Sequence, residues 1–189
     1  KKELSLLTMP YIMIDRTFPG TDCGRVSFDH EQGGYLATKY LLEQGHTKIG
    51  CVYRDDKAGS GKNRLDGYLR ALKEFDIPVL EKYLAKGDYR MESGYFAAKE
   101  LLETDATAAF VCNDMMTLGF LRRLHEEHKQ VPWDYSIVSY DDSLQNYLFG
   151  IELTTIVQDI KVLAKEACQL MFGRLRKEVV VKNEIILPP

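Results

Sequence analysis

The sequence predicts an α/β protein with parallel sheets, and three observations lead to that fold class. Short apolar runs alternate with amphipathic segments of about 10–15 residues, which is the order of β-α-β units. The run Ala108–Cys112 has no polar interruption, as expected of a strand in a sheet that is covered on both faces. With 189 residues, of which 45% are hydrophobic and 28% charged, the chain can bury a sizeable core.

The expected strands are apolar runs bounded by polar or turn residues. In chain order they cover residues 10–15, 25–29, 48–53, 83–86, 108–112, 135–140, 153–157 and 179–187. Several of them end in a polar residue, such as Asp15, Asp29 or Asp141. Polar residues therefore gather where the strands end.

The expected helices place their apolar residues on one face. They cover residues 31–44, 62–75, 92–103, 113–127 and 160–176. The first has Leu36 and Leu41 on one face and stops at Gly45, a residue suited to the left-handed position after a helix. Asn113 is the expected N-terminal cap of the fourth helix.

The composition excludes several classes of function. The 25 basic and 28 acidic residues give a net charge of −3, unlike the basic surface that binds a nucleic acid. No run reaches 18 apolar residues, so we expect no transmembrane helix and no membrane partner. Because Lys1 rather than Met opens the chain, we expect a piece of a longer protein.

The cysteines indicate neither a metal nor a redox site. Cys23, Cys51, Cys112 and Cys168 are far apart and form no C-x-x-C motif, and the four histidines do not cluster either. Cys51 and Cys112 lie inside apolar runs and are expected to be buried thiols of a reduced, cytoplasmic protein. We therefore expect no metal, no cofactor and no catalytic residue.

A candidate site follows from the strand ends, because ligands of parallel sheets bind just beyond the carboxyl ends of the strands. The polar residues at such positions are Asp15, Arg16, Asp29, residues 54–64, Tyr89, Asn113, Asp114, Asp141, Asp142 and Gln158. Carboxylates and amides with an arginine suit the donors and acceptors of sugar hydroxyls, and an aromatic ring suits the apolar face of a sugar. The pattern favours sugar binding.

Some of these residues allow an interpretation other than ligand binding. The loop 56–63 lies where a phosphate-binding P-loop would lie, but Asp56 and Asn63 replace the required Gly and Ser or Thr. A Gly-rich surface loop and a sugar-facing loop that ends in Arg64 both remain open. For Asn113 and Asp114, one alternative is that they serve as a helix cap and a first-turn acid and nothing more. Both roles are compatible, because a cap residue at the carboxyl end of a strand is also placed to contact a ligand. The adjacent acids at 141 and 142 point opposite ways on an extended strand end, so paired acid–base catalysis is disfavoured.

Eight segments occur in an order typical of one family. They are Pro10–Arg16, Val26–His30, Leu41–Gly50, Arg64–Tyr68, Ala109–Asp114, Val131–Pro132, Ser136–Asp142 and Leu153–Gln158. In this order they resemble the effector-binding core of LacI/GalR-type bacterial transcription repressors, over nearly the whole chain. The acidic loop before Arg64 also resembles the arabinose repressor group, in which a GntR-type DNA-binding domain precedes the same core.

The resemblance implies a periplasmic-binding-protein-like (type I) core of two doubly wound parallel-sheet subdomains with a ligand between them. Residues 1–28 and 159–177 would be a remnant of the amino-terminal subdomain, which is truncated here. Residues 29–158 and 178–189 would form the carboxyl-terminal subdomain, with hinge crossings near Asp29, Gln158 and Glu178. The ligand contacts implied by the family are Asp15, Ser60, Arg64, Tyr89, Asn113, Asp141 and Gln158.

We interpret the chain as the ligand-sensing core of a homodimeric cytoplasmic repressor that catalyses no reaction. A small-molecule effector, a sugar or a related metabolite, would shift subdomain closure, and a DNA-binding domain absent from this chain would bind the operator. The alternative is a periplasmic or secreted sugar-binding protein of a transporter, which the free thiols disfavour. An enzyme acting on sugars is disfavoured because no activated nucleophile is evident.

Overall fold

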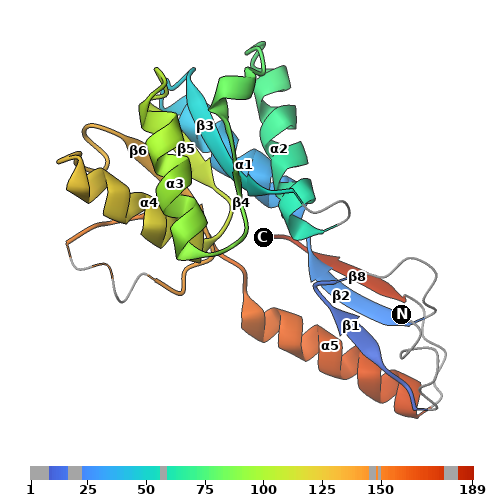
Figure 1. Cartoon of the computed structure of the whole chain (residues 1–189). Coiled ribbons are helices and arrows are strands. Elements are labelled where there is room, and N and C mark those ends of the chain that lie inside the picture. The colour runs from blue at the N-terminus through green and yellow to red at the C-terminus, as the bar shows by residue number, and fades with distance from the viewer. Residues whose placement is uncertain (1–8, 17–22, 56–58, 145–147, 149, 177–182) are drawn as a thin grey trace. The chain divides into compact units, whose positions relative to one another are not determined.

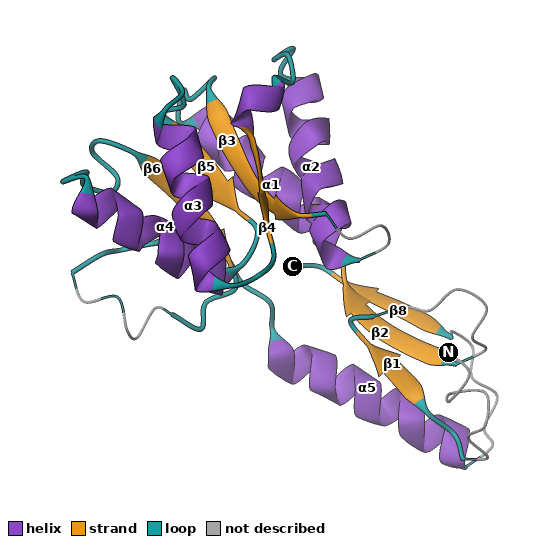
Figure 2. Ribbon diagram, viewed as in Figure 1, coloured by secondary structure: helices purple, strands orange, loops and turns teal. Residues whose placement is uncertain are grey.

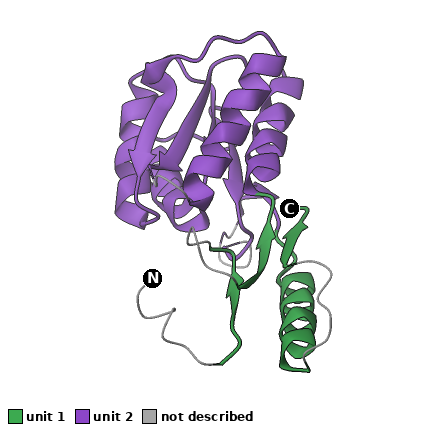
Figure 3. Cartoon of the chain, turned by 90° about the vertical axis from the view of Figure 1, so that its right-hand side faces the viewer, with its two compact units in different colours: residues 1–29, 158–189 green, residues 30–157 purple. Residues whose placement is uncertain are grey.

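The computed structural model describes residues 9–16, 23–55, 59–144, 148, 150–176 and 183–189. Contacts between residues divide the chain into two units, which Figure 3 colours separately. Unit 1 comprises Lys1–Asp29 and Gln158–Pro189, and unit 2 comprises His30–Val157. Unit 2 is therefore one continuous stretch of chain, whereas unit 1 is assembled from two separate stretches.

Unit 2 is built on a five-stranded sheet with the order β4-β3-β5-β6-β7. Its strands are β3 (Ile49–Arg54), β4 (Leu84–Gly87), β5 (Ala108–Val111), β6 (Ser136–Tyr140) and β7 (Thr154–Ile156). All four pairings are parallel, with Cys51 opposite Phe110 in the central pair. The carboxyl ends of the five strands consequently share one edge of the sheet.

Helices cover both faces of this sheet, as Figures 1 and 2 show. On one face lie α1 (His30–Glu43) and α2 (Ser60–Glu74), and on the other lie α3 (Met91–Leu102) and α4 (Asp114–Glu126). A short 3-10 helix, η2 (Glu81–Tyr83), precedes β4. The unit is a doubly wound α/β layer, as predicted.

Glycines let the helices of each face approach one another closely. A side chain at Gly34 of α1 would overlap the backbone of Arg64 in α2, and one at Gly67 would overlap the carbonyl oxygen of Glu31. In the α3–α4 pair, Gly94 and Gly119 make the same kind of backbone contact. The spacing between helices depends on the side chains at the contact, and here backbone meets backbone.

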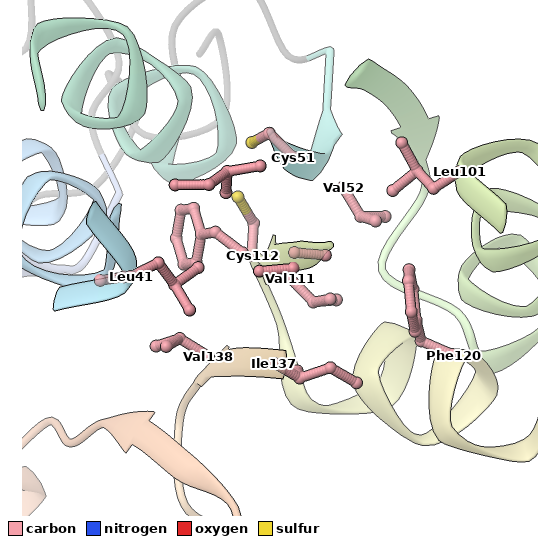
Figure 4. Packing of buried hydrophobic residues seen from close by; sticks show 14 of the residues in the cluster. Leu41, Cys51, Val52, Leu101, Val111, Cys112, Phe120, Ile137 and Val138 are labelled. Atoms are coloured by element: carbon pink, nitrogen blue, oxygen red, sulfur yellow. The ribbon is translucent and has the colours of Figure 1, made fainter. Parts of the chain in front are cut away.

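The core of unit 2 lies on both sides of the sheet (Figure 4). Cys51 and Cys112 face the α1–α2 side, whereas Val52 and Ile137 face the α3–α4 side. These side chains alternate between the faces because neighbouring residues of a strand point to opposite sides. Both cysteines are wholly buried free thiols, which confirms their predicted position.

Unit 1 is a smaller assembly. Its strands β1 (Ile12–Ile14), β2 (Gly24–Phe28) and β8 (Glu184–Leu187) form a parallel sheet in the order β1-β2-β8, and α5 (Ile160–Leu175) packs against β1 and β2. Among its described residues, the buried apolar cluster consists of Val26, Ala167 and Leu170, with partly buried apolar residues around them. This cluster is much smaller than that of unit 2.

In the described residues, the expected helices and strands are present within a few residues of their predicted bounds, and η2 is an element that was not expected. Of the strand predicted over residues 179–187, β8 confirms 184–187, and residues 179–182 lie outside the described residues. Gly45 has the predicted left-handed conformation, with φ of 91°. Asn113 caps α4 by accepting a hydrogen bond from the backbone N–H of Met116, as predicted. No described helix is long and apolar enough to cross a membrane.

One part of the predicted domain division is wrong. The prediction assigned residues 178–189 to the subdomain that contains 29–158, but β8 pairs in parallel with β2 and belongs to unit 1. An apolar pattern indicates that a strand forms but does not indicate which strand it pairs with. The hinge crossing expected near Glu178 lies outside the described residues.

Candidate functional site

Five of the predicted ligand contacts belong to unit 2 and follow the carboxyl ends of its strands. Ser60 and Arg64 lie in the first turns of α2, after β3, and Tyr89 follows β4. Asn113 caps α4 after β5, and Asp141 directly follows β6. We call these five residues the sheet-edge cluster. Loops at this edge of a parallel sheet are where such folds bind ligands.

Arg64 is the most constrained member of the cluster. It is only 5% exposed, and its guanidinium lies 3.5 Å from the centre of the Tyr140 ring. Its terminal nitrogen Nη1 donates to the backbone carbonyl of Cys112 and lies 4.0 Å from Oδ2 of Asp141. A stacked guanidinium with fixed hydrogen bonds loses little freedom when it binds a further acceptor.

His30 completes the surroundings of Arg64, and sequence reasoning did not include it. Its Nδ1 lies 3.4 Å from Nε and 3.3 Å from Nη2 of Arg64, and 3.4 Å from the hydroxyl of Tyr140. The imidazole is 4% exposed and begins α1. One signal could have found it: His30 immediately follows an expected strand end, the position from which the other candidates were chosen.

Tyr89 and Ser60 form a second contact within the cluster. Their hydroxyl oxygens lie 3.3 Å apart, and the guanidinium of Arg54 lies 5.1 Å from the centre of the Tyr89 ring. Tyr89 has a φ of 70°, a left-handed conformation that non-glycine residues adopt rarely. Such strained residues concentrate at binding sites, where neighbouring contacts hold them in place.

Asn113 has a structural role that its position at the sheet edge does not exclude. Its side-chain oxygen accepts from Met116 at 2.9 Å, and its amide donates to the carboxylate of Asp114 at 2.8 Å. Ser143 donates to the other oxygen of Asp114. Asn113 contacts the rest of the cluster through its chain neighbour Cys112, whose carbonyl accepts from Arg64.

Asp141 is held by its backbone in a strained position. Its φ is 73°, its N–H donates to the carbonyl of Ile156 at 2.9 Å, and its carbonyl accepts from the Thr155 hydroxyl at 2.6 Å. These two bonds to β7 hold the strained residue in place. The carboxylate is thereby kept beside Arg64.

The two remaining predicted contacts, Asp15 and Gln158, belong to unit 1. Asp15 has a φ of 56°, and its carboxylate oxygen lies 3.5 Å from the backbone nitrogen of Phe28, which donates to it. The side-chain nitrogen of Gln158 is buried and has no hydrogen-bond partner among the described residues. Gln158 is the first residue of unit 1 after unit 2, and Asp15 contacts Phe28, which lies two residues before the chain enters unit 2 at His30.

The chemistry of the cluster is that of hydrogen bonding. It offers a guanidinium, a carboxylate, an amide, a hydroxyl and an aromatic ring, which together suit a polyhydroxylated ligand. The thiol of Cys51 is unsuited to attack on a substrate, because burial and hydrogen bonding with Cys112 raise its pKa. In the described part of the chain, no three His, Cys, Asp or Glu side chains are grouped to hold a metal ion.

Comparisons with known proteins find a consistent set of relatives. Residues 38–189 match the family model of the periplasmic binding protein-like domain. The HTH-type transcriptional repressor PurR of Vibrio atlanticus is 32% identical over 89% of this chain and 51% of its own length. The chain thus spans about half the length of the curated relatives that it matches.

Solved structures agree in fold over nearly the whole chain. A LacI family transcriptional regulator from Enterococcus faecium, with bound ribose, is 33% identical and has a TM-score of 0.86 over 95% of this chain and 67% of its own. The complex of the transcriptional regulator CelR with cellobiose is 30% identical and has a TM-score of 0.86 over 95% of this chain and 56% of its own.

Proposed function

This chain belongs to the periplasmic-binding-protein-like family, as the effector-binding core of a LacI/GalR-type repressor, and from that membership we propose that it binds a sugar at the sheet-edge cluster. The sugar is the small-molecule effector, and Ser60, Arg64, Tyr89, Asn113 and Asp141 are its contacts in unit 2. The other two contacts that the family resemblance implies, Asp15 and Gln158, belong to unit 1. The ribose and cellobiose complexes of two relatives support this ligand class.

The observation that carries the proposal is the arrangement of Arg64 beside Asp141. A buried guanidinium donates, and 4.0 Å from it a carboxylate accepts. A sugar hydroxyl does both, so two neighbouring hydroxyls match this pair of opposite hydrogen-bonding groups. Tyr89, oriented by Arg54 and Ser60, offers the aromatic surface on which the apolar face of a sugar packs.

The whole protein is proposed to be a cytoplasmic repressor that acts as a homodimer. Its DNA-binding domain lies outside this chain, and a GntR-type domain, as in the arabinose repressor group, is one candidate. Effector binding shifts the equilibrium between conformations of the core, and the operator affinity changes by the same coupling free energy. The relatives described above are transcriptional regulators, which favours this function over a transporter's binding protein or an enzyme.

A thermal-shift screen of the full-length protein with pentoses, hexoses, sugar phosphates and purines tests the ligand class. A sugar that binds the folded state adds about 2.7 kcal/mol to its stability at a hundredfold excess over Kd. Stabilisation by a purine, with none by any sugar, would overturn the proposal.

Asp141→Asn tests the location of the site, with Asp142→Asn as a matched control. Asn tolerates the left-handed backbone of Asp141, so the variant should fold. It should weaken binding of the sugar found in the screen, whereas the exposed neighbour should not matter. Equal affinities of both variants and the native protein would remove Asp141 from the site.

A further inference from the structure

The contact between His30 and Arg64 has a chemical requirement of its own. A guanidinium only donates hydrogen bonds, and both its Nε and its Nη2 are directed at Nδ1 of His30. Nδ1 must therefore carry a lone pair. The imidazole is neutral in this arrangement, and its proton resides on Nε2.

The neutral imidazole fixes one edge of the guanidinium. Arg64 has five N–H groups, and those on Nε and one on Nη2 are directed at His30, while Nη1 donates to Cys112. The remaining N–H groups lie on the terminal nitrogens, of which Nη1 is 4.0 Å from Oδ2 of Asp141. Without an acceptor at Nδ1, the side chain would lose the bond that sets its rotation.

A protonated His30 would oppose this arrangement. Two cations would then share a buried position, with N–H groups directed at each other. The amino end of α1 also disfavours a cation there. The other groups that surround the contact are the Tyr140 hydroxyl from β6, Asp141 beyond Arg64, Asp29 before His30 in the chain, and Glu31, which pairs with Arg70 at 2.9 Å.

We propose that His30, in its neutral form, positions Arg64 for the effector, and that effector binding is therefore coupled to protonation of His30. Acidification weakens binding because the charged imidazole displaces the guanidinium. His30 is a positioning residue that does not itself contact the effector. The inference rests on the proposed function, in which Arg64 is the effector contact.

The first test needs no effector. Long-range proton–nitrogen correlation spectra of the full-length protein should show His30 at neutral pH with its proton on Nε2. The Nε–H of Arg64 should give a slowly exchanging signal that disappears on acidification. In His30→Asn, whose side-chain oxygen replaces Nδ1 as a non-titrating acceptor, the Arg64 signal should persist. A proton on Nδ1 at neutral pH would overturn the proposal.

The second test follows affinity from pH 8 to pH 5, the range in which histidine changes charge, with D-ribose as a neutral probe in titration calorimetry. Binding by the native protein should weaken about tenfold, the loss expected for one hydrogen bond to a charged group. His30→Asn should bind with little pH dependence. His30→Leu, which has no acceptor, should bind weakly at every pH.

A control separates this inference from the proposed function. His46→Gln alters a histidine whose Nδ1 lies 2.8 Å from the hydroxyl of Thr107, just before β5, and should leave the pH dependence unchanged. If Arg64→Lys does not weaken ribose binding, the proposed function fails. If it does and the His30 variants behave as the native protein, only the present inference fails. If ribose gives no heat, the tautomer and the Arg64 signal decide the positioning role.

Discussion

Unit 2 buries its sheet between two pairs of helices, whereas in the described residues of unit 1 three strands are covered by a single helix. Phe110 and Val111 in the centre of unit 2 are wholly buried. In unit 1, by contrast, Ile160 is 70% exposed and Phe172 is 57% exposed. Among the described residues, unit 2 therefore has the larger buried apolar core and unit 1 the smaller one, so we expect unit 1 to open at the lower free energy.

The largest loss of stability is expected for a substitution in the core of unit 2. Phe110→Ala should lower the free energy of unfolding by about 3–5 kcal/mol, because it removes a wholly buried ring and leaves a cavity. Val26→Ala in unit 1 deletes fewer atoms from a thinner core and serves as the comparison. Urea unfolding followed by circular dichroism measures both. A larger loss for the unit 1 variant would contradict the ranking of the two cores.

Hydrogen exchange tests the same ranking without mutation. Amides of β1, β2 and α5 should exchange about a hundredfold faster than those of β3 and β5, because unit 1 opens at a lower free energy. Exchange measured by mass spectrometry on this chain resolves the two regions. Equal protection would show that unit 1 finds a partner, such as a second copy of the chain.

Arg64→Lys tests whether a residue of unit 2 can be changed so that sugar binding weakens while the fold is retained. The variant keeps the positive charge but loses the planar fork, so it should weaken sugar binding by about 1.5–3 kcal/mol, or roughly tenfold to over a hundredfold. Calorimetry with the sugar identified in the screen gives the affinity, and circular dichroism checks the fold. Affinity equal to that of the native protein would exclude Arg64 from the site.

The smallest effect is expected from an exposed ionic cluster of unit 2. Lys48, Lys82 and the Tyr83 hydroxyl all donate to Asp105, and these bonds hold the pKa of Asp105 well below its ordinary value. Because the folded pKa is below the unfolded one, the stabilisation is present above about pH 4 and is lost as the pH falls through the folded pKa.

Asp105→Asn should accordingly lower Tm slightly at pH 7, because exposed ion pairs contribute little. The difference in Tm between the variant and the native protein should shrink as the pH falls below 4 or so. Differential scanning calorimetry at several pH values follows it. A difference that grows on acidification would have the wrong sign and contradict the assignment.

The sequence was sufficient for the elements and for the places where polar residues gather, because both depend on local patterns. The contact between His30 and Arg64 was not foreseen, since it joins residues 34 positions apart and needs the crossing of α1 and α2. The pairing of β8 with β2 was missed for the same reason: strand pairing depends on long-range packing. The short η2 has no apolar period of its own from which it could be predicted.

The contact of Gly34 with the backbone of Arg64 has a consequence for the evolution of specificity. Any side chain at Gly34 or Gly67 would push α1 and α2 apart and carry Arg64 away from His30. Substitutions at these two glycines would alter ligand affinity although neither residue contacts the ligand. We expect natural selection to remove most of them. New ligand preferences should therefore arise by changes at Ser60 and Tyr89, whose exchange leaves the helix crossing intact.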